Sequence, residues 1–303
     1  MFKSRIGFCC IALEDYGFSG TKFKSTTLSW CLKNKTKADE KLELIYSNNL
    51  KELAKVINYC IEKKIWIYRI SSDMFPLADH EDFKHVYEKF ANDKSNWTEA
   101  ISAIEIYYSM GGRCSTHPPQ FCSIGSEKES VRINSIKCLE HHASFMDNLG
   151  LPQNLNAHIN IHLSNGKDPI PLLPNYKNSL SKLSISVLSR LTFENEHSGF
   201  WKVSNIKSLF PNVPIVFDSL HYKCNPDESL SFEDAFVSAF NSWKNATPVF
   251  HHSEGKDSEE DKKHSDYIQK IPDIFSQYPV DIEIEAKAKN LAVLGYRNAL
   301  LEI

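Results

Sequence analysis

The segment Ile215–His221, IVFDSLH, joins a short apolar run directly to two potential metal ligands, Asp218 and His221. Three other segments in the C-terminal half have the same form, and they are LTFEN (191–195) with Glu194, PVFHH (248–252) with His251 and DIEIE (281–285) with Glu285. The carboxyl ends of the strands of a (β/α)8 barrel converge on one rim, where such enzymes carry their active sites. The four segments therefore predict a barrel with a multinuclear metal site.

Short β-rich runs alternate with longer stretches of helical periodicity along the whole chain, which is typical of a parallel sheet with crossover helices. Strands are predicted at 5–9, 65–70, 113–116, 157–163, 191–193, 214–217, 248–250 and 281–284. Helices are predicted at 50–63, 97–110, 129–149, 175–188, 203–209, 232–243, 266–275 and 285–301. The chain has no G-x-G-x-x-G or Walker motif, which an open doubly wound sheet usually carries. We expect an α/β fold, a single (β/α)8 TIM barrel that occupies residues 1–303 as one domain.

The composition limits the class of protein. No apolar segment approaches the roughly 20 residues that a membrane helix needs, and the N-terminus lacks the form of a secretory signal. The eight cysteines show no C-x-x-C spacing, so we expect reduced thiols and an intracellular protein without a membrane partner. A net charge of -3 argues against broad adhesion to nucleic acid. A DNA enzyme stays open, because cations in a cleft would supply local positive charge.

Histidines extend the ligand pattern beyond these four segments. His117 lies in STHPPQF, His162 lies in INIHLSNG, and His264 lies in the loop after the seventh predicted strand. So many ionisable groups on one rim would be costly to bury without cations between them. Imidazole and carboxylate ligands without thiolate suit Mn, Zn or a similar cation, and Glu194 can bridge two ions. Such a site fits phosphodiester hydrolysis by a metal-bound hydroxide. Sugar isomerisation is the competing chemistry, although it needs fewer histidines.

Nine segments together resemble a known family, the UV damage endonucleases, which are TIM-barrel relatives of endonuclease IV. These segments are RIGFCC (5–10), YRISSDMFPLADH (68–80), THPPQF (116–121), NIHL (160–163), LTFEN, FDSLH (217–221), HHSEG (251–255), KKHSDY (262–267) and IEAKAK (284–289). The resemblance spans nearly the whole chain. It implies incision immediately 5′ to UV photoproducts, both cyclobutane dimers and 6-4 products, in double-stranded DNA. It also implies two to three divalent ions, with Mn²⁺ the usual one and Zn²⁺, Mg²⁺ or Co²⁺ as alternatives.

The resemblance also implies roles for single residues. His117, His162 and Glu194 would hold one metal, Glu194, Asp218, His251 and Glu285 a second, and His221 with His264 a third. His80 would lie at the rim, beside the ligands or against a phosphate, and Lys287 would contact the scissile phosphate. Relatives usually carry a lysine, which can be carboxylated, where this chain has Val249. We therefore expect weaker occupancy of the third metal site.

The expected lesion reader is the pair Gln120 and Phe121, which match a polar and an aromatic residue that the family inserts into the duplex. A damaged and poorly stacked step costs less to unstack, and the inserted side chains fill the gap. Phe8 and Ala12 occupy positions where the family usually has a tyrosine and an asparagine lining the lesion pocket, and Phe8 is the expected lesion contact there. We expect a monomer that associates with the nucleoid when it acts.

Two other functions remain open. An abasic-site endonuclease of the endonuclease IV type would use the same ligands, and Gln120 with Phe121 favours a bulkier lesion without excluding abasic sites. A lesion-binding protein with reduced catalysis would account for Val249, Phe8 and Ala12, but the complete set of carboxylates and histidines argues against it.

Overall fold

Eight parallel strands form the centre of the molecule. In the computed structural model, which describes residues 4–163 and 168–301, they lie in the order β6-β5-β4-β3-β2-β1-β8-β7. The strands are β1 (Ile6–Cys10), β2 (Ile67–Ile70), β3 (Arg113–Thr116), β4 (Ile159–Ile161), β5 (Leu191–Glu194), β6 (Ile215–Val216), β7 (Val249–His252) and β8 (Asp281–Ile284). All eight predicted strands are present, and their observed ends differ from the predicted ends by no more than two residues.

The sheet closes into a nearly complete barrel where β6 meets β7. A single parallel bridge joins Asp218 to His251 beyond the short strand β6. The backbone N–H of His251 donates to the carbonyl of Phe217 over 3.0 Å at the same place. The predicted TIM barrel is therefore confirmed.

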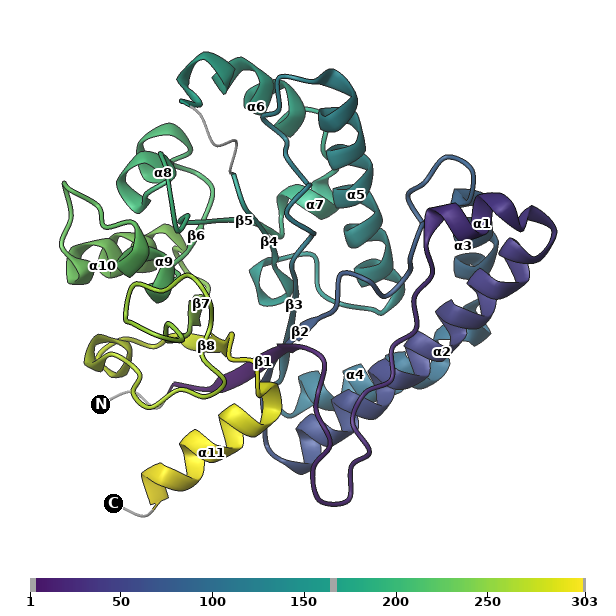
Figure 1. The fold of residues 1–303 in the computed structure, drawn as a ribbon, viewed down its shortest axis with the longest axis horizontal. Helices are drawn as coiled ribbons and strands as arrows, with labels where there is room; N and C mark the ends of the chain where they lie inside the picture. The colour runs from purple at the N-terminus through teal and green to yellow at the C-terminus, as the bar shows by residue number, and fades with distance from the viewer. Residues whose placement is uncertain (1–3, 164–167, 302–303) are drawn as a thin grey trace.

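The helices lie outside the strands (Figure 1). They are α1 (Leu28–Lys33), α2 (Lys35–Glu62), α3 (Lys84–Asn92), α4 (Thr98–Ser109), α5 (Glu129–Asn148), α6 (Leu173–Leu180), α7 (Ile185–Leu188), α8 (Val203–Leu209), α9 (Ser219–Cys224), α10 (Phe232–Ser242) and α11 (Lys289–Leu301). Helices α2 and α4 pack side by side, and α1 lies at the edge of the molecule farthest from β6. No helix in the described ranges is long and apolar enough to cross a membrane.

Two predicted helices are wrong. The segment 266–275 is irregular except for the start of a short 3-10 turn at Asp273–Ser276, because Pro272 supplies no N–H and restricts the residue before it. The predicted helix 175–188 is two helices, α6 and α7. The second begins where the hydroxyl of Ser184 accepts a hydrogen bond from the backbone N–H of Val187, which is a typical N-cap. Helix α2 also starts fifteen residues earlier than predicted, at Lys35 rather than Leu50.

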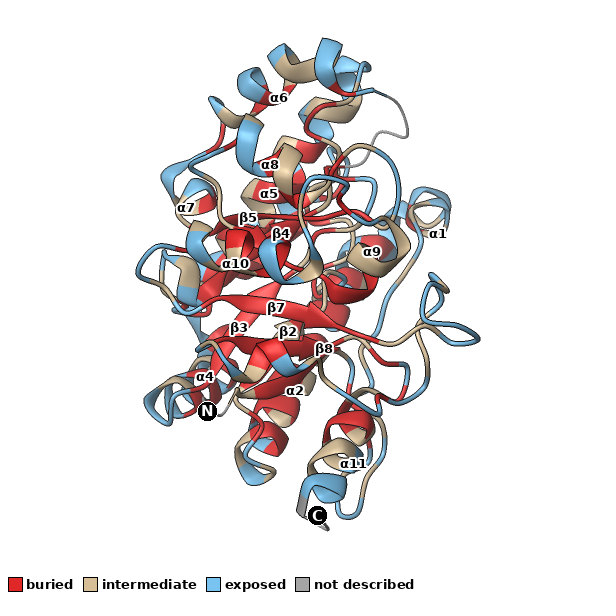
Figure 2. Cartoon of the chain, turned by 90° about the vertical axis from the view of Figure 1, so that its left-hand side faces the viewer, coloured by how far each residue is buried: buried red, intermediate tan, exposed pale blue. Residues whose placement is uncertain are grey.

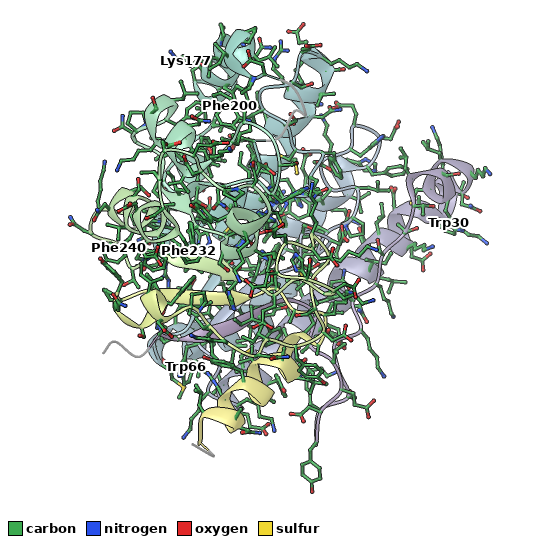
Figure 3. All side chains as sticks on the ribbon, turned by 60° about the vertical axis from the view of Figure 1, so that its left-hand side comes forward. Trp30, Trp66, Lys177, Phe200, Phe232 and Phe240 are labelled. Atoms are coloured by element: carbon green, nitrogen blue, oxygen red, sulfur yellow. The ribbon has the colours of Figure 1, made fainter. Side chains whose placement is uncertain are left out.

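The core consists of two kinds of packing. Apolar side chains fill the layer between strands and helices, so the strands are buried while the outer helix faces are exposed (Figure 2). The aromatic residues Phe232 and Phe240 on α10 contribute to this layer (Figure 3). The barrel interior instead contains buried acids and histidines, among them Glu194 and His251 at 1% and 0% exposure. This polar interior is the candidate site.

Candidate metal centre

The carboxylate of Glu194, the last residue of β5, is the centre of the site. Its Oε2 lies 3.1 Å from Nε2 of His117 and 3.8 Å from Nε2 of His162. Its Oε1 lies 3.2 Å from Nδ1 of His221 and 3.2 Å from Nδ1 of His251. Four imidazoles from four different strand ends therefore surround one buried carboxylate, and its two oxygens face different pairs.

Two groups of donor atoms are close enough to hold metal ions. One consists of His117, His162 and Glu194, and the other of Glu194, Asp218 and His251, with the ligand atoms of each group within 4.8 Å of one another. Glu194 belongs to both groups, which is the arrangement of a carboxylate that bridges two ions. The structure thus brings together all three residues of the first predicted ligand set and three of the four in the second.

Asp218 provides a test of whether these residues fit a cation. Its Oδ1 accepts a hydrogen bond from the backbone N–H of His221 over 2.7 Å and caps helix α9. Its Oδ2 is buried and has no hydrogen-bond partner in the described part of the chain. A buried carboxylate oxygen left without a partner is costly, and a divalent cation would remove that cost. The mixture of imidazole nitrogen and carboxylate oxygen suits Mn²⁺ or Zn²⁺.

Glu285, the fourth residue of the second predicted set, lies beside this cluster. One of its oxygens is 3.6 Å from Nδ1 of His251, and the other is 3.9 Å from Nδ1 of His264. The guanidinium of Arg69 forms an ion pair with the same carboxylate. His264 and His221, predicted to share the third metal, thus contact different carboxylates, Glu285 and Glu194 respectively.

The electrostatics show how the cluster shares charge. Burial lowers the pKa of His251, but the adjacent Glu194 and Glu285 outweigh burial and raise it well above its usual value. At His221 burial also lowers the pKa, but the carboxylates of Asp218 and Glu194 raise it by more, so the pKa of His221 rises to about 10. Burial would raise the pKa of Glu194, yet His251 and His162 bring it well below its usual range. Metal binding at such ligands releases the protons that the imidazoles hold.

Three residues of the site, the buried Asn160 and Glu283 and the partly buried Arg69, were not predicted from the sequence. Asn160 donates to Oε2 of Glu194 over 2.5 Å. Glu283 lies 3.2 Å from Nε2 of His251, and Arg69 projects from β2 toward Glu283 and Glu285. The sequence did contain a signal for Asn160 and Glu283. Alternate residues of a strand share a face, and each of these two lies two positions before a predicted ligand. The arginine had no comparable signal.

Two predicted catalytic residues lie apart from the ligand cluster. His80, half-buried in the turn after β2, accepts a hydrogen bond at Nδ1 from the backbone N–H of Asp82 over 3.2 Å. Its ring packs near Phe83. Lys287 is exposed between β8 and α11, and its backbone N–H donates to the carbonyl of Ser265 over 3.0 Å. The side chains of His80 and Lys287 make no contact with the ligand cluster within the described ranges.

The predicted lesion readers differ in their exposure. Gln120 and Phe121 lie in the loop after His117, and Phe121 is 74% exposed. Phe8 is fully buried in β1, where its ring meets Tyr68 edge to face with the centroids 5.4 Å apart. Phe8 therefore has no surface with which to contact DNA, and its expected role as a lesion contact is not supported.

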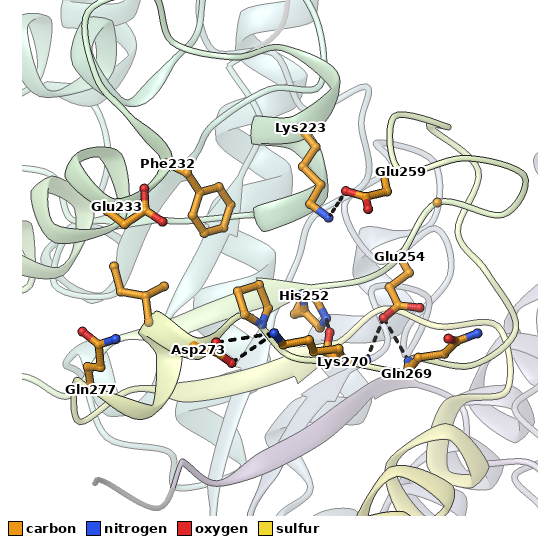
Figure 4. Close-up of a pocket in the computed structure, with 13 residues that line it drawn as sticks. Lys223, Phe232, Glu233, His252, Glu254, Glu259, Gln269, Lys270, Asp273 and Gln277 are labelled. Atoms are coloured by element: carbon orange, nitrogen blue, oxygen red, sulfur yellow. Dashed lines mark hydrogen bonds and ion pairs between the residues drawn. The ribbon is translucent and has the colours of Figure 1, made fainter.

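A separate hollow of about 700 Å³ lies between α9, α10 and the segment after β7 (Figure 4). None of the residues that line it is a predicted ligand. Four of its charged groups form ion pairs, Lys223 with Glu259 over 3.0 Å and Lys270 with Asp273 over 3.3 Å. The hollow is therefore distinct from the metal centre.

Comparison with known proteins gives a consistent result. The family model described as UV-endonuclease UvdE matches residues 4–303. The chain is 30% identical to a UV DNA damage endonuclease of Nostoc sp., over 98% of this chain and 90% of that protein. It is 28% identical to the enzyme of the same description from Deinococcus radiodurans, over 97% and 94% of the two chains.

Solved structures agree in fold. The crystal structure of SacUVDE superposes with a TM-score of 0.83 at 25% identity and covers 99% of both chains. A D-tagatose 3-epimerase-like protein superposes with a TM-score of 0.56 at 12% identity, over 82% of this chain and 94% of that one. The second likeness concerns the barrel fold alone.

Proposed function

The chain belongs to the UV-endonuclease UvdE family, and we propose that it is a metal-dependent DNA repair endonuclease that incises the phosphodiester immediately 5′ to UV photoproducts. That it is a DNA endonuclease follows from the family and from its relatives. The metal dependence, the position of the cut and the choice of lesion are the proposal.

One observation carries the metal dependence: Glu194 presents each of its oxygens to a different pair of histidines. The buried Oδ2 of Asp218 adds to it, because this oxygen has no hydrogen-bond partner among the described residues. Divalent ions bound there would supply a hydroxide nucleophile and stabilise the leaving oxyanion. The protein's part is to orient the ligands. Asn160 holds Glu194 through a hydrogen bond, and the cap of α9 fixes Asp218.

The proposed substrate is double-stranded DNA that contains a UV lesion, bound by a monomer. Gln120 and Phe121 support this choice because they are exposed on the loop that leads from His117. An exposed aromatic ring on such a loop can stack on a base or fill the gap left by a displaced one. His80 and Lys287 are retained as proposed phosphate contacts, because His80 is partly exposed and Lys287 is exposed three residues after β8.

We further propose that two ions bind tightly and a third binds weakly. The two donor groups around Glu194 supply the tight sites. The third site would depend on His221 and His264, and Val249 is a buried apolar residue that offers no ligand atom. Mn²⁺ is the expected ion.

The test is a nicking assay with supercoiled plasmid and Mn²⁺. Plasmid is irradiated with UV, depurinated, or left untreated, and open circles are scored. Nicking confined to irradiated plasmid supports the proposal, and equal nicking of depurinated plasmid supports an abasic-site endonuclease. Binding of irradiated DNA without nicks indicates a lesion-binding protein.

A matched pair of variants tests the assignment of the centre. Glu194→Gln keeps the shape of the side chain but removes the bridging charge, so nicking should be lost. Glu259→Gln, at an exposed ion pair of the separate hollow, should nick normally. A Glu194→Gln protein that cuts at the normal rate would overturn the metal assignment.

A further inference from the structure

Glu283 has a contact that the proposed chemistry does not use. It pairs in register with His251 across β7 and β8, and both side chains are fully buried. Glu283 Oε2 lies 3.2 Å from Nε2 of His251, on the side of the ring away from Glu194. Neither of these two atoms has a hydrogen-bond partner in the described part of the chain, and the two face each other as an ion pair.

We propose that Glu283 is a positioning residue, which holds His251 so that Nδ1 is the ligand atom and Nε2 carries the hydrogen. This inference rests on the proposed function of the same site. A ligating histidine commonly donates its second N–H to a carboxylate, which fixes both the tautomer and the orientation of the ring. Here Nδ1 faces Glu194 at 3.2 Å and Glu285 at 3.6 Å, and Nε2 faces Glu283.

The surroundings of Glu283 favour this role over that of a ligand. The hydroxyl of Ser115 donates to Oε1, and Arg69 NH1 lies 3.6 Å from Oε2. These groups stabilise the buried charge and leave Oε2 directed at the imidazole. Glu283 also belongs to neither group of donor atoms that could hold an ion.

The strand register explains why this carboxylate is available. Asp281, Glu283 and Glu285 alternate along one face of the β8 segment, so they occupy successive depths of the barrel. Asp281 pairs with Arg113 at 2.8 Å, Glu285 contacts His251 and His264, and Glu283 lies between them. Only the middle acid faces the second nitrogen of His251.

The experiment compares Glu283→Gln and Glu283→Leu with the unaltered chain. Calorimetric titration of the metal-free proteins with Mn²⁺ measures the number of ions and their affinities. Nitrogen-15 NMR of histidine-labelled protein loaded with diamagnetic Zn²⁺ shows which nitrogen of His251 carries the hydrogen, with His251→Gln identifying its signals. Circular dichroism checks that each variant is folded.

We expect a single tautomer with hydrogen on Nε2 in the unaltered chain. Glu283→Leu should mix the tautomers and weaken Mn²⁺ binding about 10- to 100-fold, with the same number of ions bound. Glu283→Gln keeps an acceptor oxygen and an almost identical volume, so it should retain most of the affinity. This partial rescue separates positioning from simple filling of space.

Three results would overturn the role. They are an unchanged tautomer and affinity in Glu283→Leu, hydrogen on Nδ1 in the unaltered chain, and loss of one whole ion in Glu283→Gln, which would make Glu283 a ligand. If Glu283→Leu does not fold, hydrogen on Nδ1 in the unaltered chain or loss of one ion in Glu283→Gln still overturns the role, and hydrogen on Nε2 with the number of ions unchanged supports it. Failure of the proposed function is separate, because it would appear as Mn²⁺ binding without nicking of irradiated plasmid in the unaltered chain.

Discussion

The side-chain amide of Asn160 donates a hydrogen bond of 2.5 Å to Oε2 of Glu194. Thr192 donates in turn to Oδ1 of Asn160 over 3.0 Å, and all three residues are buried. This chain of hydrogen bonds runs along the inner faces of β4 and β5. It sets the orientation of the carboxylate that the proposed centre depends on most.

Replacing Asn160 with leucine should therefore lower nicking of irradiated plasmid about 10- to 100-fold at a fixed Mn²⁺ concentration, because leucine has a similar size but no donor. Asn290 is a suitable control, since its buried amide joins Leu13 and Tyr59 and not the ligand cluster. Asn290→Leu should lower the melting temperature yet leave the nicking rate of the folded protein unchanged. Normal nicking by Asn160→Leu would show that the hydrogen bond is dispensable.

Phe121→Ala should weaken binding to UV-irradiated duplex by about ten- to a hundredfold, since stacking of a base on an aromatic ring contributes about 1–3 kcal/mol. The melting temperature should stay unchanged, because the ring is 74% exposed. Ile185→Ala, at an exposed position on α7, is the control for a general surface change. Fluorescence anisotropy with irradiated and unirradiated duplexes measures the effect, and an equal loss on both would count against lesion reading.

Asp281→Asn should reduce the free energy of unfolding by about 3 kcal/mol, because it leaves the buried Arg113 guanidinium without its charged partner. Arg113 NH1 lies 2.8 Å from Asp281, and Arg5 forms a second pair with the same carboxylate over 2.6 Å. Asp273→Asn breaks an exposed pair with Lys270 and should change stability by less than about 0.5 kcal/mol. Urea denaturation of both variants compares the two pairs, and similar losses would contradict this expectation.

The stability of the protein should fall as the pH drops from about 6.5 to 4. Burial lowers the pKa of His141 to about 4, so the folded state keeps this ring neutral while the unfolded chain takes up a proton below its ordinary value of 6.5. The stabilisation is thus complete above pH 6.5 and lost progressively below it, by up to about 3 kcal/mol. Thermal melts between pH 4 and 7 should show a shallower decline for His141→Leu. A variant at the exposed His85 should decline like the unaltered protein, and equal slopes in all three would refute the assignment.

Titration of metal-free protein with Mn²⁺ should resolve two tight ions and a weaker third. Two donor groups share Glu194 and supply the tight sites. The third site lacks a ligand because the buried Val249 has no ligand atom. Isothermal calorimetry with the full chain provides the measurement. Three ions of equal affinity would sink the expectation of weak occupancy.

The strand ends were predictable because the ligands follow runs of residues with strong β propensity. All of the predicted ligands except His221, which lies in α9, and His264 stand at or just after a strand, and the structure brings five of them into the two donor groups. Eight alternating strand and helix segments without a glycine-rich phosphate motif then favoured a closed parallel sheet over an open one. Local pattern and topology were sufficient here.

Other features depended on contacts that a linear pattern does not contain. Asn160 and Glu283 lie on the inner faces of their strands. A search for polar residues at strand ends finds only the last polar residue of each strand and misses those that come two positions earlier. Phe8 was predicted from the resemblance to the family, and only the structure, in which Phe8 packs against Tyr68, reveals that it is buried. The break between α6 and α7 depends on a single N-cap at Ser184.

The join between β6 and β7 has a consequence for how this protein can vary. The ring of strands is completed by one backbone bridge, and its two residues, Asp218 and His251, both belong to the same group of proposed ligands. Any change that widens this join also changes the separation of two ligand side chains. Substitutions in the outer layer around β6 and α10 are therefore expected to change the proposed metal centre, although the outer layer holds none of its proposed ligands.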